Sequence, residues 1–224
     1  VTAITTGVPV PSTAAVYGWP EQALINEKHP VTPINPYGRS KLAVEWMLQD
    51  YASAYGIKAV CLRYFNAAGA AIDVSNGERH DPETHLIPLL LQALSGRRQG
   101  IKIFGTDYAT PDGTCIRDYI HILDLAQAHL LALNWLLIQP SCIYRAFNLG
   151  NGAGFSVRQV IVTAEEITGQ HLNEEASARR VGDPAILVAS AEQAKQVLGW
   201  QPQYTQLQEI ITHAWAWEQK LSGL

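Results

Sequence analysis

The stretch that decides the fold runs from residue 35 to residue 65 and reads NPYGRSKLAVEWMLQDYASAYGIKAVCLRYF. Asn35 can cap a helix, Pro36 suits the first helical position, and Gly56 can end the helix. The apolar run at 58–65 predicts a buried strand directly after this helix. A helix that leads straight into a buried strand is typical of an α/β protein.

The rest of the chain continues this alternation of strands and helices. Residues 8–11 have the character of a strand, but Pro9 and Pro11 would remove two hydrogen-bond donors from it. Residues 19–35 and 66–84 are predicted loops. The remaining elements expected are strands at 101–104, 116–122 and 146–149, and helices at 86–94, 123–137, 157–168, 191–198 and 207–221.

Composition and charge exclude several classes of protein. The chain has 224 residues, of which 47% are hydrophobic and 16% charged, and its formal net charge is −4. Because basic residues form no run and no apolar run could span a bilayer, we expect no nucleic-acid partner and no membrane segment. The cysteines and histidines have no ligand spacing, so we expect no metal. The unpaired cysteines and the lack of a signal peptide predict a cytoplasmic protein.

The helix start also contains the first candidate for chemistry, Tyr37-Gly-Arg-Ser-Lys41. Residues four apart share one face of a helix, so Tyr37 and Lys41 are expected side by side. A tyrosine hydroxyl is a poor base unless a nearby ammonium favours the phenolate, so such a pair suits proton removal from an alcohol. The alternative is an ordinary surface pair, because this spacing arises easily by chance among nine tyrosines.

Further motifs follow in a fixed order along the chain. Together they resemble the UDP-glucose 4-epimerase family of the extended short-chain dehydrogenase/reductase superfamily. The resemblance extends from Ser12 to about Leu221. One of these motifs precedes Tyr37, and it is Ser12-Thr-Ala-Ala-Val-Tyr-Gly18. The others follow it, and they are Leu62-Arg-Tyr-Phe-Asn-Ala-Ala-Gly69, Ile103-Phe-Gly-Thr-Asp-Tyr108, Pro111-Asp-Gly-Thr114, Ile116-Arg-Asp-Tyr-Ile-His121, Phe147-Asn-Leu-Gly-Asn-Gly152 and Arg179-Arg-Val-Gly-Asp183.

The resemblance implies an NAD-dependent isomerase that interconverts UDP-glucose and UDP-galactose by inverting C4 of the sugar. Thr13 would hydrogen-bond the sugar 4-hydroxyl, and Tyr37 would be the base. Lys41 would hold the nicotinamide ribose, and Tyr64 would lie near the nicotinamide. It also implies an α/β fold, made of the C-terminal part of a Rossmann-type parallel sheet domain and a smaller mixed α/β substrate-binding domain.

The resemblance further implies a set of residues for the UDP-sugar. Two arginines would clamp the diphosphate through paired, charge-assisted hydrogen bonds. The alternative for Arg117 is an ion pair with the adjacent Asp118. The residues carried over are Asn66, Arg117 and Arg180 for the diphosphate, Lys102 and Phe104 beside the uracil, Asp183 for the ribose, and His85 and Leu86 where the family has an Asn-Leu pair beside the substrate.

The first half of such an enzyme is expected to be missing. A Rossmann domain carries a glycine-rich turn after its first strand, and no such turn precedes Tyr37. We therefore expect a truncated member of the family, with residues 1–66 as a remnant of the NAD-binding domain. Segments around 116–150 would return to that remnant, and residues 67–224 would mainly bind the UDP-sugar. The family forms homodimers, and this is doubtful for a chain without the helix before Tyr37.

Three alternatives to this function remain at the level of sequence. A dTDP-glucose 4,6-dehydratase has an acidic pair after the catalytic threonine, whereas Ala14 and Ala15 follow Thr13 here. A 4-epimerase for another UDP-sugar is a second alternative, because Leu187 occupies a position that lines the sugar pocket in the family. The third is an inactive fragment that at most binds UDP-sugars weakly.

Overall fold

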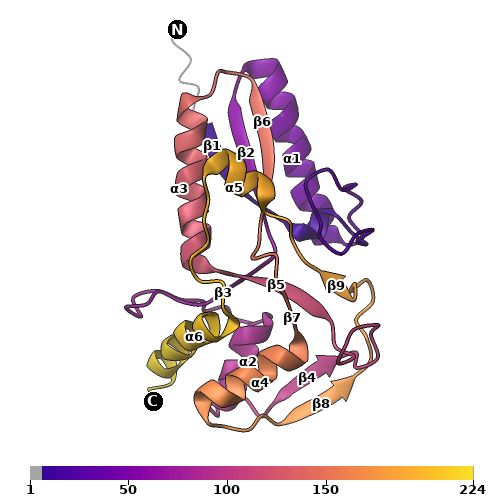
Figure 1. Ribbon diagram of the computed structural model, residues 1–224, viewed down its shortest axis with the longest axis vertical. Helices are drawn as coiled ribbons and strands as arrows, with labels where there is room; N and C mark the ends of the chain where they lie inside the picture. Colours follow the sequence, from indigo (N-terminus) through magenta and orange to yellow (C-terminus); the bar gives the residue numbers. More distant parts are fainter. Residues whose placement is uncertain (1–6, 224) are drawn as a thin grey trace.

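The computed structural model describes residues 7–223, arranged in two halves that lie one above the other in Figure 1. Residues 1–6, with which the predicted NAD-binding remnant begins, and residue 224 lie outside the described residues. None of the described helices has both the length and the apolar character needed to cross a membrane.

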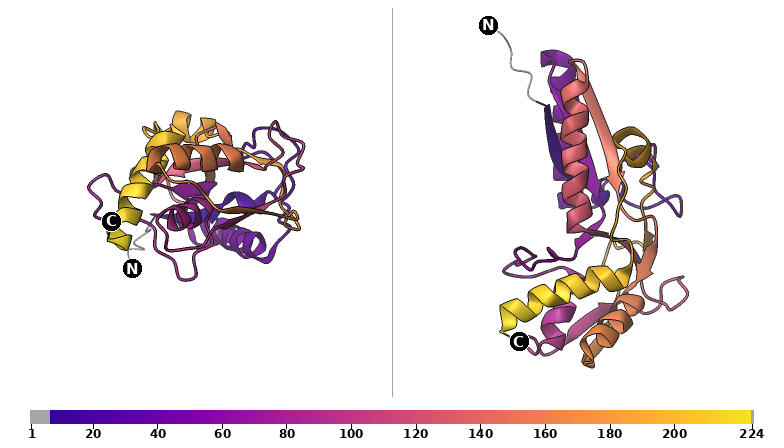
Figure 2. Two further views of the ribbon diagram at one scale, coloured as in Figure 1. Left: turned by 90° about the horizontal axis from the view of Figure 1, so that it is seen from below. Right: turned by 60° about the vertical axis from the view of Figure 1, so that its left-hand side comes forward.

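The first half is a parallel sheet of three strands in the order β1-β2-β6: β1 (Gly7–Thr13), β2 (Lys58–Tyr64) and β6 (Ile143–Leu149). The helices α1 (Pro36–Tyr55) and α3 (Ile122–Ile138) stand on either side of these strands, as Figures 1 and 2 show. The short helix α5 (Glu192–Leu198) packs against the same half. A 3-10 turn, η1 (Ala14–Val16), follows β1 and contacts α1.

Alternation along β2 explains how the sheet is covered on both faces. Val60 and Leu62 point into a buried cluster with apolar residues of α3, α5 and β6, including Leu136 and Phe147. The next residue, Arg63, points to the opposite face, where it reaches Glu45 on α1. A strand buried on both faces is typical of parallel sheets between helices.

The helix α1 starts and stops at the predicted residues. The Asn35 side chain accepts the backbone N–H of Gly38 at 2.8 Å, and Gly56 ends the helix with φ 70°. Gly38 also permits a close approach, because a Cβ there would lie 2.3 Å from the carbonyl oxygen of Ala15. The start of α1 is therefore pressed against the turn after β1.

The second half is built on a mixed sheet with three helices packed against it. Strand β5 (Ile116–His121) pairs in parallel with β3 (Asn66–Ala68) and β9 (Ile186–Leu187), and antiparallel with β7 (Gly154–Ser156). A separate parallel pair joins β4 (Ile101–Phe104) and β8 (Glu174–Ser177). The helices α2 (Leu86–Leu94), α4 (Val157–Thr168) and α6 (Leu207–Ser222) share a second apolar core.

The predicted α/β class is confirmed, with a parallel sheet followed by a smaller mixed α/β part. Most elements lie where the sequence placed them, and the differences fall on strands. β6 begins at Ile143 rather than at residue 146, and the predicted loop 66–84 begins with β3. The short strands β7, β8 and β9 were not predicted, because two to four residues are too few for periodicity to register.

The segment with the two prolines is a complete strand at the edge of the described sheet. β1 pairs with β2 without interruption from Gly7 to Thr13. Pro9 and Pro11 cannot donate, so the residues between them must make the donations to β2. Both proline nitrogens therefore face away from β2, toward the outer edge of β1.

Candidate functional site

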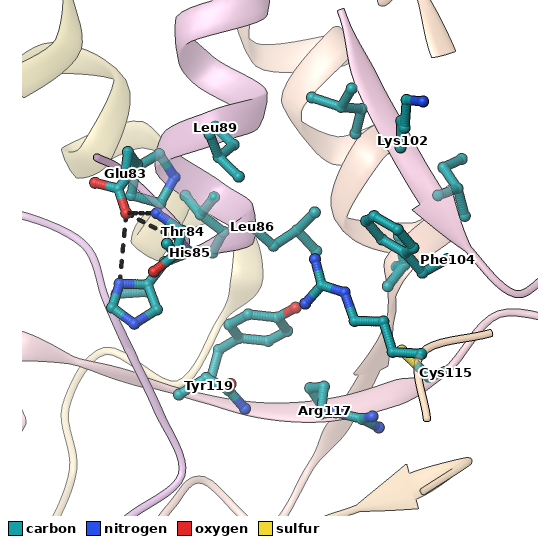
Figure 3. A pocket seen from close by; sticks show the side chains of 18 of the residues that line it. Glu83, Thr84, His85, Leu86, Leu89, Lys102, Phe104, Cys115, Arg117 and Tyr119 are labelled. Atoms are coloured by element: carbon teal, nitrogen blue, oxygen red, sulfur yellow. Dashed lines mark hydrogen bonds and ion pairs between the residues drawn. The ribbon is translucent and has the colours of Figure 1, made fainter. Parts of the chain in front are cut away.

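A cavity of 690 Å³ opens between the mixed sheet, α2 and β4, and Figure 3 shows its lining. Residues from six separate stretches of sequence converge on it, with Tyr119 at its floor and Leu86 and Leu89 on the α2 side. All eight residues predicted to bind the UDP-sugar beyond Thr13 line this cavity, namely Asn66, His85, Leu86, Lys102, Phe104, Arg117, Arg180 and Asp183.

Cationic groups lie close to an aromatic ring inside the cavity. The guanidinium carbon of Arg180 is 4.2 Å from the centroid of the Phe104 ring. Lys102 reaches outward, and its Nζ lies 3.5 Å from a carboxylate oxygen of Glu175. The cavity therefore offers positive charge next to a flat apolar surface, which suits an anionic ligand that carries an aromatic ring.

Arg117 is buried and forms its ion pair with Asp183, which is distant in sequence. Its NH1 group also donates to the carbonyl of Ile116 at 2.7 Å. The alternative pairing with Asp118 is wrong. The Asp118 carboxylate turns away and accepts the backbone N–H groups of Asn151, Gly152 and Ala189 at 2.7, 3.0 and 3.0 Å.

Asp118 thus has a structural role rather than a role in the cavity. It fixes the loop after β6 and the segment that follows β9 to the mixed sheet. Burial raises the pKa of its carboxyl to about 6, and the three N–H donors oppose that shift.

Tyr37 and Lys41 share one face of α1, as predicted, but they lie outside the lining of the large cavity. Tyr37 is 56% exposed, and the Lys41 ammonium lies 5.9 Å from the centroid of its ring. The ammonium also donates to the carbonyl of Pro11 on β1 at 3.3 Å. Thr13, at the carboxyl end of β1, is buried, and its Oγ1 accepts the N–H of Ala15 at 3.2 Å.

Tyr64 ends β2 directly beside Thr13 in the sheet register. Its hydroxyl lies 2.5 Å from Nε2 of His129 on α3. Burial raises the pKa of Tyr64 to about 12, with a further contribution from the neighbouring Tyr37. The carboxyl ends of β1 and β2 thus bring Thr13 and Tyr64 to one edge of the sheet, where open α/β folds bind nucleotides.

The sequence did not reveal a buried polar network that ties α1 to the sheet. The Glu45 carboxylate accepts two hydrogen bonds from Arg63, at 3.0 and 2.5 Å, and one from Ser12 at 2.5 Å. Arg63 also donates to the hydroxyl of Tyr17 at 2.8 Å, which in turn donates to Asn148 at 2.6 Å. This network fixes the orientation of the helix that contains Tyr37.

The sequence also did not reveal a cluster of titratable groups next to the cavity. Glu78, His80, Glu83 and His85 bring their side chains together in the loop between β3 and α2. The only signal was His85 itself, at a position where the family resemblance predicted a different residue.

Comparisons with known proteins match this geometry to one family. Residues 7–150 match the model of the NAD dependent epimerase/dehydratase family. A UDP-glucose 4-epimerase of Streptococcus mutans is 55% identical to the chain over 207 residues, which is 92% of this chain and 61% of that protein. The chain spans about three-fifths of the length of the curated relatives that it matches.

Solved structures give the same result and agree with the predicted fold class. The UDP-glucose 4-epimerase from Brucella ovis, in complex with NAD, superposes with a TM-score of 0.90 at 48% identity, over 95% of this chain and 65% of that one. The enzyme from Bifidobacterium longum, in complex with NAD+ and UDP, does so with a TM-score of 0.90 at 34% identity, over 98% and 65%.

Proposed function

Because the chain belongs to the NAD dependent epimerase/dehydratase family, we propose that it provides the base and the nucleotide-sugar site of a UDP-glucose 4-epimerase. The reaction would interconvert UDP-glucose and UDP-galactose. The observation that supports this proposal best is the cavity, since eight residues assigned to one ligand from separate motifs all line it.

In this proposal the cavity holds the UDP portion of the substrate. Arg117 and Arg180 bind the diphosphate, since guanidinium groups can engage phosphate oxygens in pairs. Phe104 and Lys102 flank the uracil, and Asp183 holds the ribose. Asn66, His85 and Leu86 line the path toward the sugar.

In this proposal the proton transfer takes place at the edge of the parallel sheet. Tyr37 removes the proton from the sugar 4-hydroxyl, and Thr13 hydrogen-bonds the same oxygen. The Lys41 ammonium, fixed by the Pro11 carbonyl, supports the phenolate form of the base. Bound NAD would supply the redox chemistry of the reaction, as acceptor and then donor of the hydride at C4.

The residues at this edge fit the nicotinamide end of that cofactor. Tyr37 and Lys41 are accessible on α1, and Tyr64 lies beside them at the end of β2. Lys41 would hold the nicotinamide ribose, and Tyr64 would contact the nicotinamide ring. In folds of this type a glycine-rich turn and a helix N-terminus hold the pyrophosphate of the cofactor.

We also propose a division of labour between the two halves. Residues 1–66, together with α3 and β6, form the unit that faces the cofactor, and residues 67–224 mainly bind the UDP-sugar. The passage from one to the other falls between β2, which ends at Tyr64, and β3, which begins at Asn66.

The test is binding of UDP and of NAD, followed by turnover of UDP-galactose, all on the same sample. We expect Arg180→Ala to weaken UDP binding about 10- to 100-fold, because a charge-assisted hydrogen bond contributes about 1.5–3 kcal/mol. Arg158→Ala is the matched control, since Arg158 pairs with Glu174 outside the cavity. Tyr37→Phe should abolish turnover and leave UDP binding unchanged.

The outcomes separate the proposed enzyme from its alternatives. UDP binding without NAD binding or turnover would favour a nucleotide-sugar-binding chain without catalysis. Turnover of another UDP-sugar in preference to UDP-galactose would revise the substrate. Absence of UDP binding in the parent chain would contradict the proposal as a whole.

A further inference from the structure

Four side chains with metal-binding atoms meet in the loop between β3 and α2. One ligand atom each from Glu78, His80, Glu83 and His85 lies within 4.8 Å of all the others. Glu83 and His85 also line the large cavity, and Figure 3 shows both at its rim. Glu78, His80 and Glu83 line a second cavity of 420 Å³. The cluster therefore lies between the two cavities.

His80 and His85 both direct their Nδ1 atoms toward the carboxylate of Glu78. Nδ1 of His80 lies 2.9 Å from Oε1 of Glu78, and Nδ1 of His85 contacts that same oxygen. The Glu83 carboxylate lies 3.7 and 3.6 Å from these two nitrogens. In a tetrahedral zinc site with bonds of about 2.0–2.2 Å, the ligand atoms are about 3.3 Å apart. Small side-chain movements would therefore admit the ion.

The two carboxylates of the cluster have few cationic partners among the described residues. The side chains of Glu78 and Glu83 are only 17% and 4% exposed, and within residues 7–223 their ion pairs are with histidines alone. Arg97 lines the second cavity, but Glu218 holds it at 2.6 and 2.7 Å. A divalent cation would neutralise the two carboxylates and leave both imidazoles neutral.

The loop is held in place by hydrogen bonds to its own backbone and by contacts with α6. The Glu83 carboxylate accepts the N–H groups of Thr84 and His85 at 2.7 and 2.9 Å. Trp217 on α6 donates its indole N–H to the Glu78 carbonyl at 2.8 Å. Gly77 lies so close to Trp217 that a Cβ would be 2.4 Å from the ring. Ligands fixed in this way by their surroundings are typical of metal sites.

We propose that Glu78, His80, Glu83 and His85 form a zinc site. Two nitrogen and two oxygen ligands favour Zn²⁺ over Mg²⁺ or Ca²⁺, which prefer oxygen ligands. The ion would join the two ends of the loop and fix the His85 ring at the rim of the large cavity. This departs from the expectation of no metal, which considered spacing along the sequence and not the fold of this loop.

The experiment is a zinc titration of the tag-free, chelator-treated chain by calorimetry, without any nucleotide. We expect one zinc ion to bind per chain. His80→Gln should weaken it by at least about 100-fold, since even indirect partners of a metal site contribute about 10- to 100-fold. His171→Gln is the matched control, because His171 forms an exposed pair with Glu165 away from the cluster. It should bind zinc like the parent chain.

Co²⁺ in place of zinc reports the ligands of the parent chain directly. We expect the absorption of tetrahedral cobalt without thiolate bands, because no cysteine belongs to the cluster. This readout decides the case if His80→Gln fails to fold. An octahedral spectrum, no saturable zinc binding, or unchanged affinity in folded His80→Gln would overturn the proposal. UDP binding is not part of this readout, so the proposed function stands or fails separately.

Discussion

At the scale of single residues, the polar groups that matter most are those that the fold buries. His121 is fully buried at the start of α3, where its Nδ1 accepts the N–H of Leu123 at 3.1 Å. Its Nε2 must therefore carry the proton and donate to Nδ1 of His213, 3.1 Å away. Burial, and then the neighbouring His213, lower the pKa of His121 to about 4.

This pKa predicts a loss of stability on acidification. The ordinary pKa of histidine is about 6.5. Between that pH and pH 4, His121 is protonated in the unfolded chain and neutral in the folded chain. The free energy of unfolding should therefore fall with falling pH, by up to about 1.4 kcal/mol per pH unit from this group. Urea unfolding at several pH values measures the slope. His121→Asn should remove this contribution, since asparagine can still cap α3.

The comparison between variant and parent isolates His121. Asp118 changes the free energy of unfolding in the opposite direction over the same pH range. Its pKa is raised to about 6, so on acidification the folded state binds a proton before the unfolded state does. Asp118 is present in both chains and cancels. His171→Asn, at an exposed position, should keep the parent's slope. An unchanged slope in His121→Asn would mean that folded His121 is protonated in this window.

Residue-level prediction from the sequence worked where a motif fixes the neighbours of a residue. Tyr37 and Lys41 share a helix face because helical geometry requires it. The partner of Arg117 could not be predicted, since Asp183 is far away in sequence and only the fold brings them together. The same holds for Glu45 and Arg63, which read as ordinary surface residues of a helix and a strand.

At the scale of elements, the helices were predictable because their ends carry local signals. Asn35 and Gly56 delimit α1. Ser156 caps α4, since its Oγ accepts the Gln159 N–H and its own N–H donates to the Gln159 side chain. The short strands lack such signals, and their pairing is decided by the neighbouring strand. β1 shows the limit of propensity, since its prolines are tolerated once they face the edge.

The outer face of α1 predicts self-association. Met47, Tyr51 and Tyr55 follow one another at four-residue spacing and are 52%, 52% and 72% exposed. A helical stripe of large apolar side chains gains free energy when another surface covers it. We expect the chain to associate through this stripe, and Tyr51→Lys to weaken the association at least about tenfold.

Sedimentation velocity over a concentration series measures this association. Ile138→Lys is the matched control, since Ile138 is an exposed apolar residue at the end of another helix, α3. It should associate like the parent chain. A parent chain that stays monomeric, or equal association of Tyr51→Lys and parent, would show that the stripe is not an interface.

At the scale of the whole molecule, the proposed function divides its site between the two halves. The cavity belongs to the mixed sheet and its helices, whereas Tyr37 and Lys41 lie on α1. Figure 1 shows α1 beside the parallel sheet. The division of function between the two halves stays a prediction, made from the order of the motifs along the chain. The sequence could not predict how the loop at 78–85 folds, because that depends on contacts with α6.

The division predicts where a nucleotide should protect the backbone. Hydrogen exchange with and without UDP should slow for locally opening amides in β4, β5 and the start of α2, which line the cavity. Amides of β1, β2 and β6 should exchange at unchanged rates. Arg180→Ala should remove the difference at the same UDP concentration. Protection centred on the parallel sheet would place the nucleotide elsewhere.

The outer edge of β1 offers hydrogen-bond acceptors but lacks donors at its middle. The two proline nitrogens lie at its middle, so the edge presents carbonyl oxygens there and no N–H groups to match them. A second strand laid along it would leave its own carbonyls opposite Pro9 and Pro11 without donors. Edges of this kind resist the stacking of strands from one molecule onto the next that leads to fibrils. Within the described residues, this side of the sheet is therefore poorly suited to pairing with a strand of another molecule.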